Sequence, residues 1–392
     1  MIFTADRIHN GHHFLADGTA IEVAEDGAII AVHEAFDGPS THLEGILCPG
    51  LINAHCHLEL SHLKDVVPQQ TGLIPFLQSV MKTRFTFNEE QKKAARHEAF
   101  NELRANGVVA VGDIANTTDT LDLRALGRLH FHTFSECIGF TETAAEARLG
   151  AAREVYEAFA AQHGDAVVLQ QSIAPHAPYS VSEKLFRLID GALPGSVISI
   201  HNEESAEENA YYQNKSGAVI ELLHGLGIDD SFFRPSGKTS LQTYLPWLGE
   251  SHPLVLVHNT FSSREDVAFA ESRSGAAFWC LCPAANLYIE GRLPEVDMLA
   301  SLTDNICIGT DSLASNTRLD VLAELRMLHD GFPAIGWETL LRWATLNGAK
   351  ALRLDAVLGS FEAGKRPGLV QITGLVGAVP KAVPVASGRL VR

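Results

Sequence analysis

The sequence predicts an α/β fold, namely a (β/α)8 TIM-like barrel with a small β-sandwich domain built from both chain ends. Three features indicate this fold: short apolar runs in the middle of the chain, helical patterns between them, and strand-like ends rich in Gly and Pro. With 392 residues, the chain can form one large domain and a small one. We expect residues 46–355 to form the barrel, and residues 1–45 and 356–392 to form the β-sandwich.

The two chain ends resemble each other in composition and pattern. In "ADGTAIEVAEDGAIIAV" the pairs Asp17-Gly18 and Asp26-Gly27 stand where hairpins would turn. The C-terminal "PGLVQI" and "VPVASGRLVR" are also strand-like. Because chain termini often lie close together, we expect the two ends to pair into one β unit.

The middle of the chain alternates apolar runs with helical patterns. The expected strands are Ile46–Asn53, Val108–Ile114, Phe131–Ile138, Val167–Ile173, Val197–Ile200, Leu254–Val257, Ala276–Leu281 and Ile306–Ile308. Two of the helical patterns, "NEEQKKAARHEAFNELRANG" and "AAEARLGAAREVYEAFAAQHG", end in Asn-Gly or His-Gly, where helices commonly terminate. An open doubly wound sheet is the alternative, but no Gly-rich dinucleotide fingerprint follows any of these strands.

Composition restricts the partners. With 47 acidic and 30 basic residues the net charge is −17, and such a surface repels phosphate backbones and anionic lipids, so we expect no nucleic acid and no membrane partner. The start "MIFTADRIHNGHHF" has no secretory pattern. The cysteines lie mostly within apolar runs, as reduced thiols of a cytoplasmic protein do: Cys48, Cys56, Cys137, Cys280, Cys282 and Cys307.

Polar side chains follow five of the predicted strands, beginning with alternate positions in "GLINAHCHLEL". In a barrel of this kind, functional groups gather at the carboxyl ends of the strands, and here these are His55, His57, His176, His201, Glu204, His258 and Asp311. A solvated face would require neighbours such as "LVLV" and "ICIG" to be exposed. Histidine and carboxylate suit Zn²⁺, with Fe²⁺ or Mn²⁺ as alternatives. We expect one divalent metal ion, with the ligands His55, His57, His201 and Asp311.

The chain resembles the amidohydrolase superfamily over nearly its whole length, through "PGLINAHCH", "HNEE", "VHNT", "GTDSLASN" and "GSFEAGKRPGLV". The resemblance implies a (β/α)8 barrel with a β-sandwich from both ends. Binuclear members carry a bridging lysine on strand four, whereas "VVLQQSIAPH" has none, which favours a single metal. The His201-x-x-Glu204 pair is similar to that of the metal-dependent aminohydrolases that deaminate nucleosides and related heterocycles.

This resemblance also implies roles for the site residues. The metal lowers the pKa of a bound water to about 7, and Glu204 passes the water proton to a ring nitrogen of the substrate. His258 hydrogen-bonds the attacking oxygen, and Asp311 binds the metal and accepts the second proton as ammonia leaves. His176 resembles a substrate-contacting residue. The alternatives are that His258 is a metal ligand and that His176 is only structural.

The extension "HCHLELSHLKDVVPQQTGLIPFL" resembles the aminodeoxyfutalosine deaminases, which implies 6-amino-6-deoxyfutalosine as substrate and a place in menaquinone biosynthesis. Deamination of S-adenosylhomocysteine, methylthioadenosine or adenosine is the alternative. In the homocysteine and methylthioadenosine enzymes a Glu after strand one holds the ribose, whereas the comparable region here carries Arg84. Glu59 is a candidate replacement, and Arg84 could bind a substrate carboxylate or lie on a solvated helix face.

Other classes remain as alternatives. A hydrolase of a ring amide or of a carbon–chlorine bond uses much the same metal site, whereas a non-catalytic relative should have lost metal ligands that this sequence retains. We therefore expect an enzyme, a hydrolase of carbon–nitrogen bonds in cyclic amidines, whose partner is a small-molecule nucleoside. A homodimer is compatible with the sequence, and residues 231–249 could form a lid or an interface.

Overall fold

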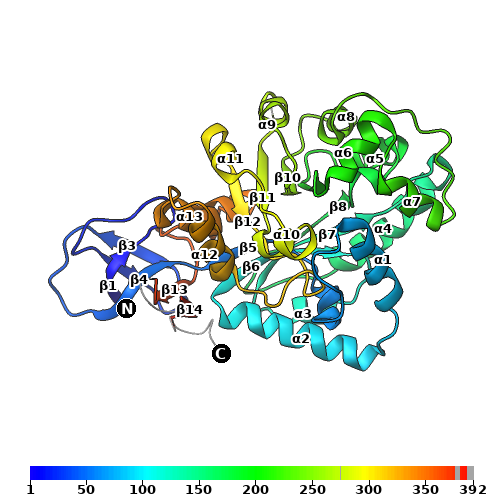
Figure 1. The fold of residues 1–392 in the computed structure, drawn as a ribbon. Helices are drawn as coiled ribbons and strands as arrows, with labels where there is room; N and C mark the ends of the chain where they lie inside the picture. The colour runs from blue at the N-terminus through cyan, green and yellow to red at the C-terminus, as the bar shows by residue number, and fades with distance from the viewer. Residues whose placement is uncertain (274, 376–379, 386–392) are drawn as a thin grey trace.

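The computed structural model of the chain describes residues 1–273, 275–375 and 380–385. Within these residues the strands form a six-stranded sheet from the chain ends and two four-stranded parallel sheets from the middle. Figure 1 shows the terminal sheet as a lobe on the left of the molecule, with the parallel sheets and their helices on the right.

The terminal sheet joins strands from both ends of the chain in the order β14-β13-β4-β1-β2-β3. Its strands are β1 (Ile2–Ile8), β2 (Ala20–Val23), β3 (Ile29–His33), β4 (Thr41–Pro49), β13 (Leu369–Thr373) and β14 (Lys381–Pro384). The turn at Asp26-Gly27 joins β2 to β3 as a hairpin, as predicted, with Gly27 at a φ of 83°. Since these strands lie in one sheet, two packed layers stay a prediction.

The first predicted strand, Ile46–Asn53, is wrong as a single element. It is divided at Gly50 into β4, which belongs to the terminal sheet, and β5 (Leu51–Cys56), which belongs to a parallel sheet. The Gly50 N–H donates to the carbonyl of Pro367 over 3.0 Å, and a Cβ atom at Gly50 would lie 2.3 Å from the Val109 side chain. Only glycine fits where the chain passes from one sheet to the other, and apolar periodicity does not record such a change.

The remaining predicted strands correspond to observed ones, with small shifts at their ends. One parallel sheet has the order β5-β6-β7-β8 and the other β12-β11-β10-β9. Their further strands are β6 (Val108–Ala115), β7 (His130–Cys137), β8 (Leu169–Pro175), β9 (Ile198–Asn202), β10 (Leu254–His258), β11 (Ala277–Leu281) and β12 (Ile306–Ile308). All pairs within these two sheets are parallel, which requires a crossover connection between successive strands.

Helices lie between the parallel strands in the sequence and pack around them (Figure 1). They are α1 (Leu73–Thr83), α2 (Glu89–Ala105), α3 (Leu121–Ala125), α4 (Ala145–Ala160), α5 (Glu183–Ala192), α6 (Ala206–Asn214), α7 (Ala218–Gly225), α8 (Ser240–Tyr244), α9 (Arg264–Glu271), α10 (Pro283–Ile289), α11 (Val296–Leu302), α12 (Val321–Gly331), α13 (Trp337–Arg342) and α14 (Gly348–Ala351). No helix among the described residues is long and apolar enough to cross a membrane.

Helix α2 shows why these segments fold where the pattern predicts them. The Asn88 side chain accepts a hydrogen bond from the Gln91 N–H over 2.9 Å, and the Gln91 side chain accepts one from the Asn88 N–H over 3.0 Å. After the helix, Gly107 adopts a φ of 79°. The helix begins and ends at local signals, and buried Phe100 and Leu103 pack it onto the apolar core.

Backbone hydrogen bonds connect the two parallel sheets at both seams. Where β12 meets β5, the N–H groups of Thr310 and Asp311 both donate to the carbonyl of His55 over 3.1 Å. Where β8 meets β9, the His201 N–H donates to the carbonyl of His176 over 3.0 Å. These contacts bring the carboxyl ends of strands from both sheets to one place.

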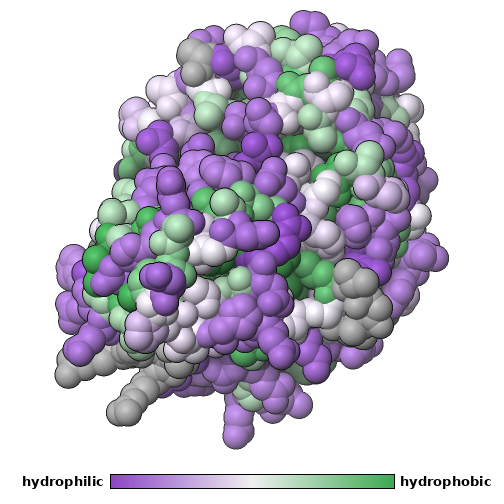
Figure 2. Space-filling view, turned by 90° about the vertical axis from the view of Figure 1, so that its left-hand side faces the viewer, coloured by the Kyte–Doolittle hydropathy of each residue, from purple (hydrophilic) through white to green (hydrophobic). Residues whose placement is uncertain are grey.

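Exposed apolar side chains are scattered on the terminal sheet. Ile30, Val32 and Val383 are exposed, whereas Ile29 and Leu47 are buried in a small apolar cluster. Figure 2 shows the left-hand side of the molecule, where hydrophobic residues lie among a mainly hydrophilic surface. This alternation is the expected pattern for a sheet with one solvated face.

Candidate metal centre and substrate cavity

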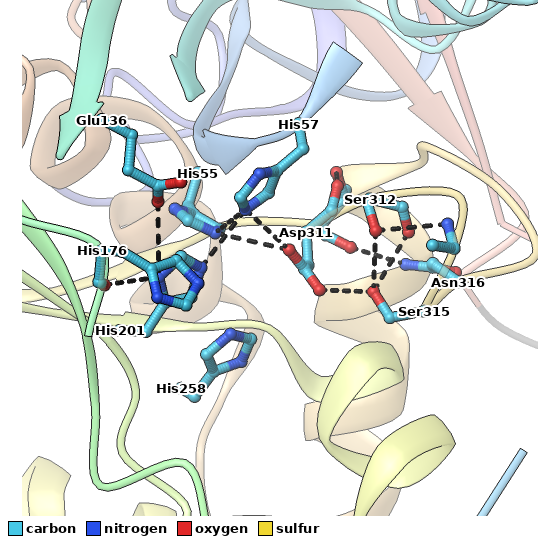
Figure 3. Close-up of polar contacts among 12 residues, drawn as sticks. His55, His57, Glu136, His176, His201, His258, Asp311, Ser312, Ser315 and Asn316 are labelled. Carbon is cyan, nitrogen blue, oxygen red and sulfur yellow. Dashed lines mark hydrogen bonds and ion pairs between the residues drawn. The ribbon is translucent and has the colours of Figure 1, made fainter. Parts of the chain in front are cut away.

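Four of the predicted site residues meet at the carboxyl ends of β5, β9 and β12. His57 Nε2 lies 3.1 Å from His55 Nε2 and 3.2 Å from His201 Nε2. Asp311 Oδ1 lies 3.4 Å from His55 Nε2 and 3.3 Å from His57 Nε2. Figure 3 shows the rings and the carboxylate facing one another.

These separations fit a metal ion. Ligand atoms about 2.0–2.1 Å from a tetrahedral Zn²⁺ lie roughly 3.3–3.5 Å from one another. The observed nitrogen and oxygen atoms are 3.1–3.4 Å apart. Imidazole nitrogens at such distances repel one another unless a proton or a cation lies between them, so the arrangement favours a bound cation. The set of His55, His57, His201 and Asp311 can therefore hold a divalent ion, and each donor is a type that Zn²⁺ accepts.

His258, at the end of β10, belongs to the same cluster. His55, His201, His258 and Asp311 have potential ligand atoms that all lie within 4.8 Å of one another. His258 Nε2 also lies 3.6 Å from Glu204 Oε1. The geometry thus keeps both predicted alternatives for His258, as a metal ligand or as a hydrogen-bonding group beside the ion.

Burial sets the protonation states in this cluster. It lowers the pKa of His57 to about 3 and that of His258 to about 4, and it lowers the pKa of His201 further below its usual value. For Asp311, burial alone would raise the pKa, but hydrogen bonding to His55 and the nearby imidazoles outweigh it and hold the pKa well below its usual range. Neutral imidazoles and an ionised carboxylate are the forms that bind metal.

Glu204 stands in the loop after β9. Burial raises the pKa of its carboxyl group well above the usual value, and the charge of Asp311 adds to this effect. The loop is held by buried Glu208, whose Oε1 accepts a hydrogen bond from the Glu203 N–H over 3.0 Å and another from the Ser240 hydroxyl. A carboxyl group whose pKa is raised in this way is suited to transfer protons as a general acid or base.

A cavity of about 180 Å³ opens beside the metal cluster. Its polar lining includes His57, His176, His201, Glu204, His258 and Asp311. The apolar lining comes mainly from α1 and the region of α7, and includes Leu73, Phe76, Leu77, Val80, Met81, Leu222 and Leu226. Residues 231–249 contribute no residue to the lining in the described part of the chain, so the cavity gives no support to a lid role for them.

His176 lines this cavity, and its ring centroid lies 4.8 Å from that of His201. His176 Nδ1 is hydrogen-bonded to the Ser180 hydroxyl over 2.7 Å, while its carbonyl accepts from His201 Nδ1 over 2.7 Å. The second contact orients the His201 ring so that Nε2 faces the cluster. The residue therefore has both a place in the cavity and a structural contact.

Glu59 and Arg84 lie together. Arg84 Nη2 is 3.5 Å from Glu59 Oε1, and Arg84 lines the cavity whereas Glu59 does not. Glu59 Oε2 accepts hydrogen bonds from the Asn116 N–H over 3.0 Å and from the Thr117 N–H and hydroxyl over 3.2 Å. These protein contacts occupy the Glu59 carboxylate, and its role as a substrate contact stays a prediction.

Sequence reasoning missed polar residues at the ends of two further strands. On β6, Asp113 accepts the Leu58 N–H over 3.2 Å and so holds the chain just after His57, and Asn116 follows the strand. On β7, Glu136 is directed into the cavity. The rule that selected the histidines, a polar residue at a strand end, also applies to these positions but was not extended to them.

A histidine and carboxylate cluster at the ends of parallel strands is typical of metal-dependent hydrolases. Residues 46–390 match the family described as "Amidohydrolase family". The chain therefore belongs to the amidohydrolase family, and the prediction of that family is confirmed.

Curated relatives carry deaminase names. The chain is 29% identical to an adenosine deaminase of Helicobacter pylori, over 83% of this chain and 78% of the relative. It is 27% identical to a 5-methylthioadenosine/S-adenosylhomocysteine deaminase of Halalkalibacterium halodurans, over 93% and 81%. It is 26% identical to an aminodeoxyfutalosine deaminase of Nitratiruptor sp., over 72% and 67%. The prediction of an enzyme, a hydrolase of carbon–nitrogen bonds in cyclic amidines, is confirmed for the class.

Solved structures share the fold. An aminofutalosine deaminase of Helicobacter pylori in complex with methylthio-coformycin has a TM-score of 0.81 and 22% identity, covering 99% of this chain and 98% of that one. An adenosine deaminase of Xanthomonas campestris with bound zinc has a TM-score of 0.75 and 23% identity, covering 96% and 87%. Both likenesses concern the arrangement of the elements over the whole chain.

Proposed function

We propose that this chain is a metal-dependent hydrolytic deaminase of an adenosine-like nucleoside. The observation that carries the proposal is the cluster of His55, His57, His201 and Asp311 at 3.1–3.4 Å, with Glu204 beside it in the wall of a cavity. Deaminase names among the relatives support the same reaction class.

We propose that the two parallel sheets form one closed (β/α)8 barrel, because backbone hydrogen bonds join them at both seams. As part of the proposal, the barrel runs to residue 355 but begins after Gly50 and not at residue 46, because β4 (Thr41–Pro49) belongs to the terminal sheet; residues 1–49 and 356–392 then form the terminal domain. Zn²⁺ is the first candidate for the metal, because three imidazoles and one carboxylate suit it, and Fe²⁺ or Mn²⁺ are alternatives. When bound, the ion lowers the pKa of a water to about 7 and so supplies the nucleophile at neutral pH.

The chain's own residues handle the protons. Glu204, whose pKa is raised by burial, takes one proton from the attacking water and passes it to the ring nitrogen next to the amino-bearing carbon, which makes that carbon electrophilic. His258, 3.6 Å from Glu204, hydrogen-bonds the oxygen that adds to this carbon. Asp311 takes the second proton from the oxygen that has added and delivers it to the amino group, which leaves as ammonia. His176, on the cavity wall, contacts the heterocycle.

The candidate substrates form two groups. 6-Amino-6-deoxyfutalosine is the first candidate, supported by the aminodeoxyfutalosine deaminase among the relatives and by the apolar cavity wall of α1 and α7. Adenosine, methylthioadenosine or S-adenosylhomocysteine is the second, supported by the other relatives. In both cases Arg84 contributes to the cavity wall and Glu59 holds Arg84.

Metal analysis and a nucleoside panel test the proposal. Purified protein should contain about one divalent ion per chain and release ammonia from at least one of these nucleosides. Chelation should abolish the release, and Zn²⁺, Fe²⁺ or Mn²⁺ should restore it. Protein without stoichiometric metal, or with full turnover after the ion is removed, would refute the metal mechanism. If the protein hydrolyses a ring amide or a carbon–chlorine bond and deaminates no nucleoside, the proposed reaction class is wrong.

A further inference from the structure

The cavity contains one carboxylate that the proposed chemistry does not use. Glu136, at the carboxyl end of β7, lines the cavity with His176 and Asn116, and its side chain is only 4% exposed. Taking an ionisable group out of water costs free energy, which must be offset by partners. A buried carboxylate facing a substrate cavity therefore calls for a function.

One oxygen of Glu136 is held by the protein and the other is free to bind. Asn116 Nδ2 donates to Glu136 Oε2 over 2.6 Å. Glu136 Oε1 lies 3.9 Å from His201 Nδ1, whose hydrogen is directed to the His176 carbonyl at 2.7 Å. Among the residues that the structure describes, no donor reaches Oε1 within hydrogen-bonding distance. Figure 3 shows this carboxylate at the upper left, above the His176 and His201 rings, while Asp311 lies to the right of these rings.

A metal role for Glu136 does not fit this geometry. Glu136, His176 and His201 have potential ligand atoms within 4.8 Å of one another. However, His201 uses Nδ1 for the carbonyl of His176 and turns Nε2 toward His57, 3.2 Å away. Because Glu136 stands at the Nδ1 edge, the width of the imidazole ring separates its carboxylate from the predicted ion.

A nucleoside carries hydrogen-bond donors that suit a free carboxylate oxygen in the cavity wall. When the amino-bearing carbon of a purine is at the metal cluster, the ribose is set away from it by the width of the base. The two neighbouring hydroxyls of a ribose are hydrogen-bond donors, and a carboxylate with a fixed orientation is an acceptor that can take both. Burial raises the pKa of Glu136 to about 7, while the hydrogen bond from Asn116 and the nearby charge of Arg84, which pairs with Glu59 at 3.5 Å, act in the opposite direction.

We propose that Glu136 accepts hydrogen bonds from the vicinal ribose hydroxyls of the substrate, with Asn116 fixing its orientation. This inference rests on the proposed nucleoside deaminase function and assigns the sugar specificity of that site to a residue on β7. It leaves Glu59 and Arg84 as positioning residues, because their carboxylate and guanidinium groups are already engaged with the protein and with each other.

The test compares nucleosides with and without the hydroxyls. For the nucleoside that the panel shows to be turned over fastest, kcat/KM is measured for the ribo, 2′-deoxy and 3′-deoxy forms with the wild type, with Glu136→Gln and with the exposed control Glu146→Gln. In the wild type and the control, kcat/KM for each deoxy form should be about 10- to 100-fold lower than for the ribo form, because a site built for a hydroxyl rejects an analogue that lacks it. In Glu136→Gln, kcat/KM for the ribo form should fall by a similar factor. The ratio of kcat/KM between the ribo and deoxy forms should then be within about threefold.

The outcomes separate this inference from the proposed function. If no nucleoside is deaminated by the wild type, the proposed function fails. If nucleosides are deaminated but the wild type does not distinguish deoxy forms, or Glu136→Gln keeps the full preference, only the role of Glu136 is overturned. Metal content and Tm should stay at wild-type values in the variant. Should Glu136→Gln not fold, Asn116→Ala gives the same test, with a smaller loss of preference expected because Oε2 is then released.

Discussion

In the described part of the terminal sheet, left-handed backbone occurs only at glycine, whereas at the carboxyl ends of the parallel strands it occurs at residues with functional side chains. Residues 1–49 have positive φ only at Gly11, Gly18, Gly27 and Gly45. At the strand ends the φ values are 73° for His258, 57° for Asn259 and 56° for Asp311. A left-handed residue other than glycine costs about 1–2 kcal/mol.

The difference shows where the chain accepts strain. A turn in the terminal sheet needs only a reversal of direction, so glycine provides it at no steric cost. At His258 and Asp311 glycine would remove the imidazole or the carboxylate that the site needs, and the surrounding contacts hold the strained backbone instead. For Asp311 these include its N–H bond to the His55 carbonyl at 3.1 Å and the hydrogen bond from the Ser315 hydroxyl.

The largest expected effect is a loss of turnover on substitution of a residue at the strand ends. Glu204→Gln should lower kcat by about 10²–10⁴, because the amide cannot transfer a proton. Metal content should not change, because Glu204 does not belong to either cluster of potential ligand atoms. Ammonia release and metal analysis check this, with Glu221→Gln on the exposed side of α7 as the control. Near-normal turnover in Glu204→Gln would show that this strand end is not where the chemistry occurs.

The second effect tests the terminal sheet. Leu47→Ala removes a fully buried side chain from its apolar cluster and should lower the free energy of unfolding by about 2–5 kcal/mol. Turnover at saturating substrate should remain within about twofold, since no residue of this sheet lines the cavity in the described part of the chain. Urea unfolding and steady-state kinetics check this, with exposed Val383→Ala as the control. A large loss of kcat in folded Leu47→Ala would contradict the separation of the two regions.

The smallest effect concerns pH. Burial raises the pKa of Glu324 from 4.5 to about 8, although the carboxylate accepts hydrogen bonds from the Ala284 N–H and from Asn316 Nδ2, both over 2.8 Å. At pH values between 4.5 and about 8, Glu324 keeps its proton in the folded protein and releases it in the unfolded chain. The free energy of unfolding that Glu324 contributes therefore falls as the pH rises. Glu324→Gln cannot ionise and should show a smaller fall.

Urea unfolding at about pH 5.5 and pH 8.5 measures this difference. We expect Glu324→Gln to lose less stability than the wild type between the two pH values, by about 1 kcal/mol or more, because a pKa difference of one between the folded and unfolded states corresponds to about 1.4 kcal/mol. Glu154→Gln, at an exposed position of α4, serves as the control. An equal fall in both proteins would show that Glu324 is ionised in the folded state across this range.

Much of the site was predictable because the relevant signals are local. His55, His57, His201 and Asp311 stand directly at the ends of apolar strands, so the strand pattern alone places them at one edge of parallel sheets. The same strand-end pattern selects Glu204 and His258, the family resemblance implies their roles, and the structure brings both to the cluster. The division at Gly50 was not predictable in this way, because its cause is a close approach to Val109 and Pro367.

The order of residues along the chain determined three features: the alternation of strands and helices, the pairing of the two ends, and the identity of the metal-ligand candidates. Each of these depends on periodicity or on the residue type at a strand end. The three-dimensional packing was needed to establish that Arg84 pairs with Glu59, that Asn116 fixes Glu136, and that Glu136 faces the cavity at the Nδ1 edge of His201. Such contacts join residues on different strands and loops, and their distances depend on how the whole set of elements packs.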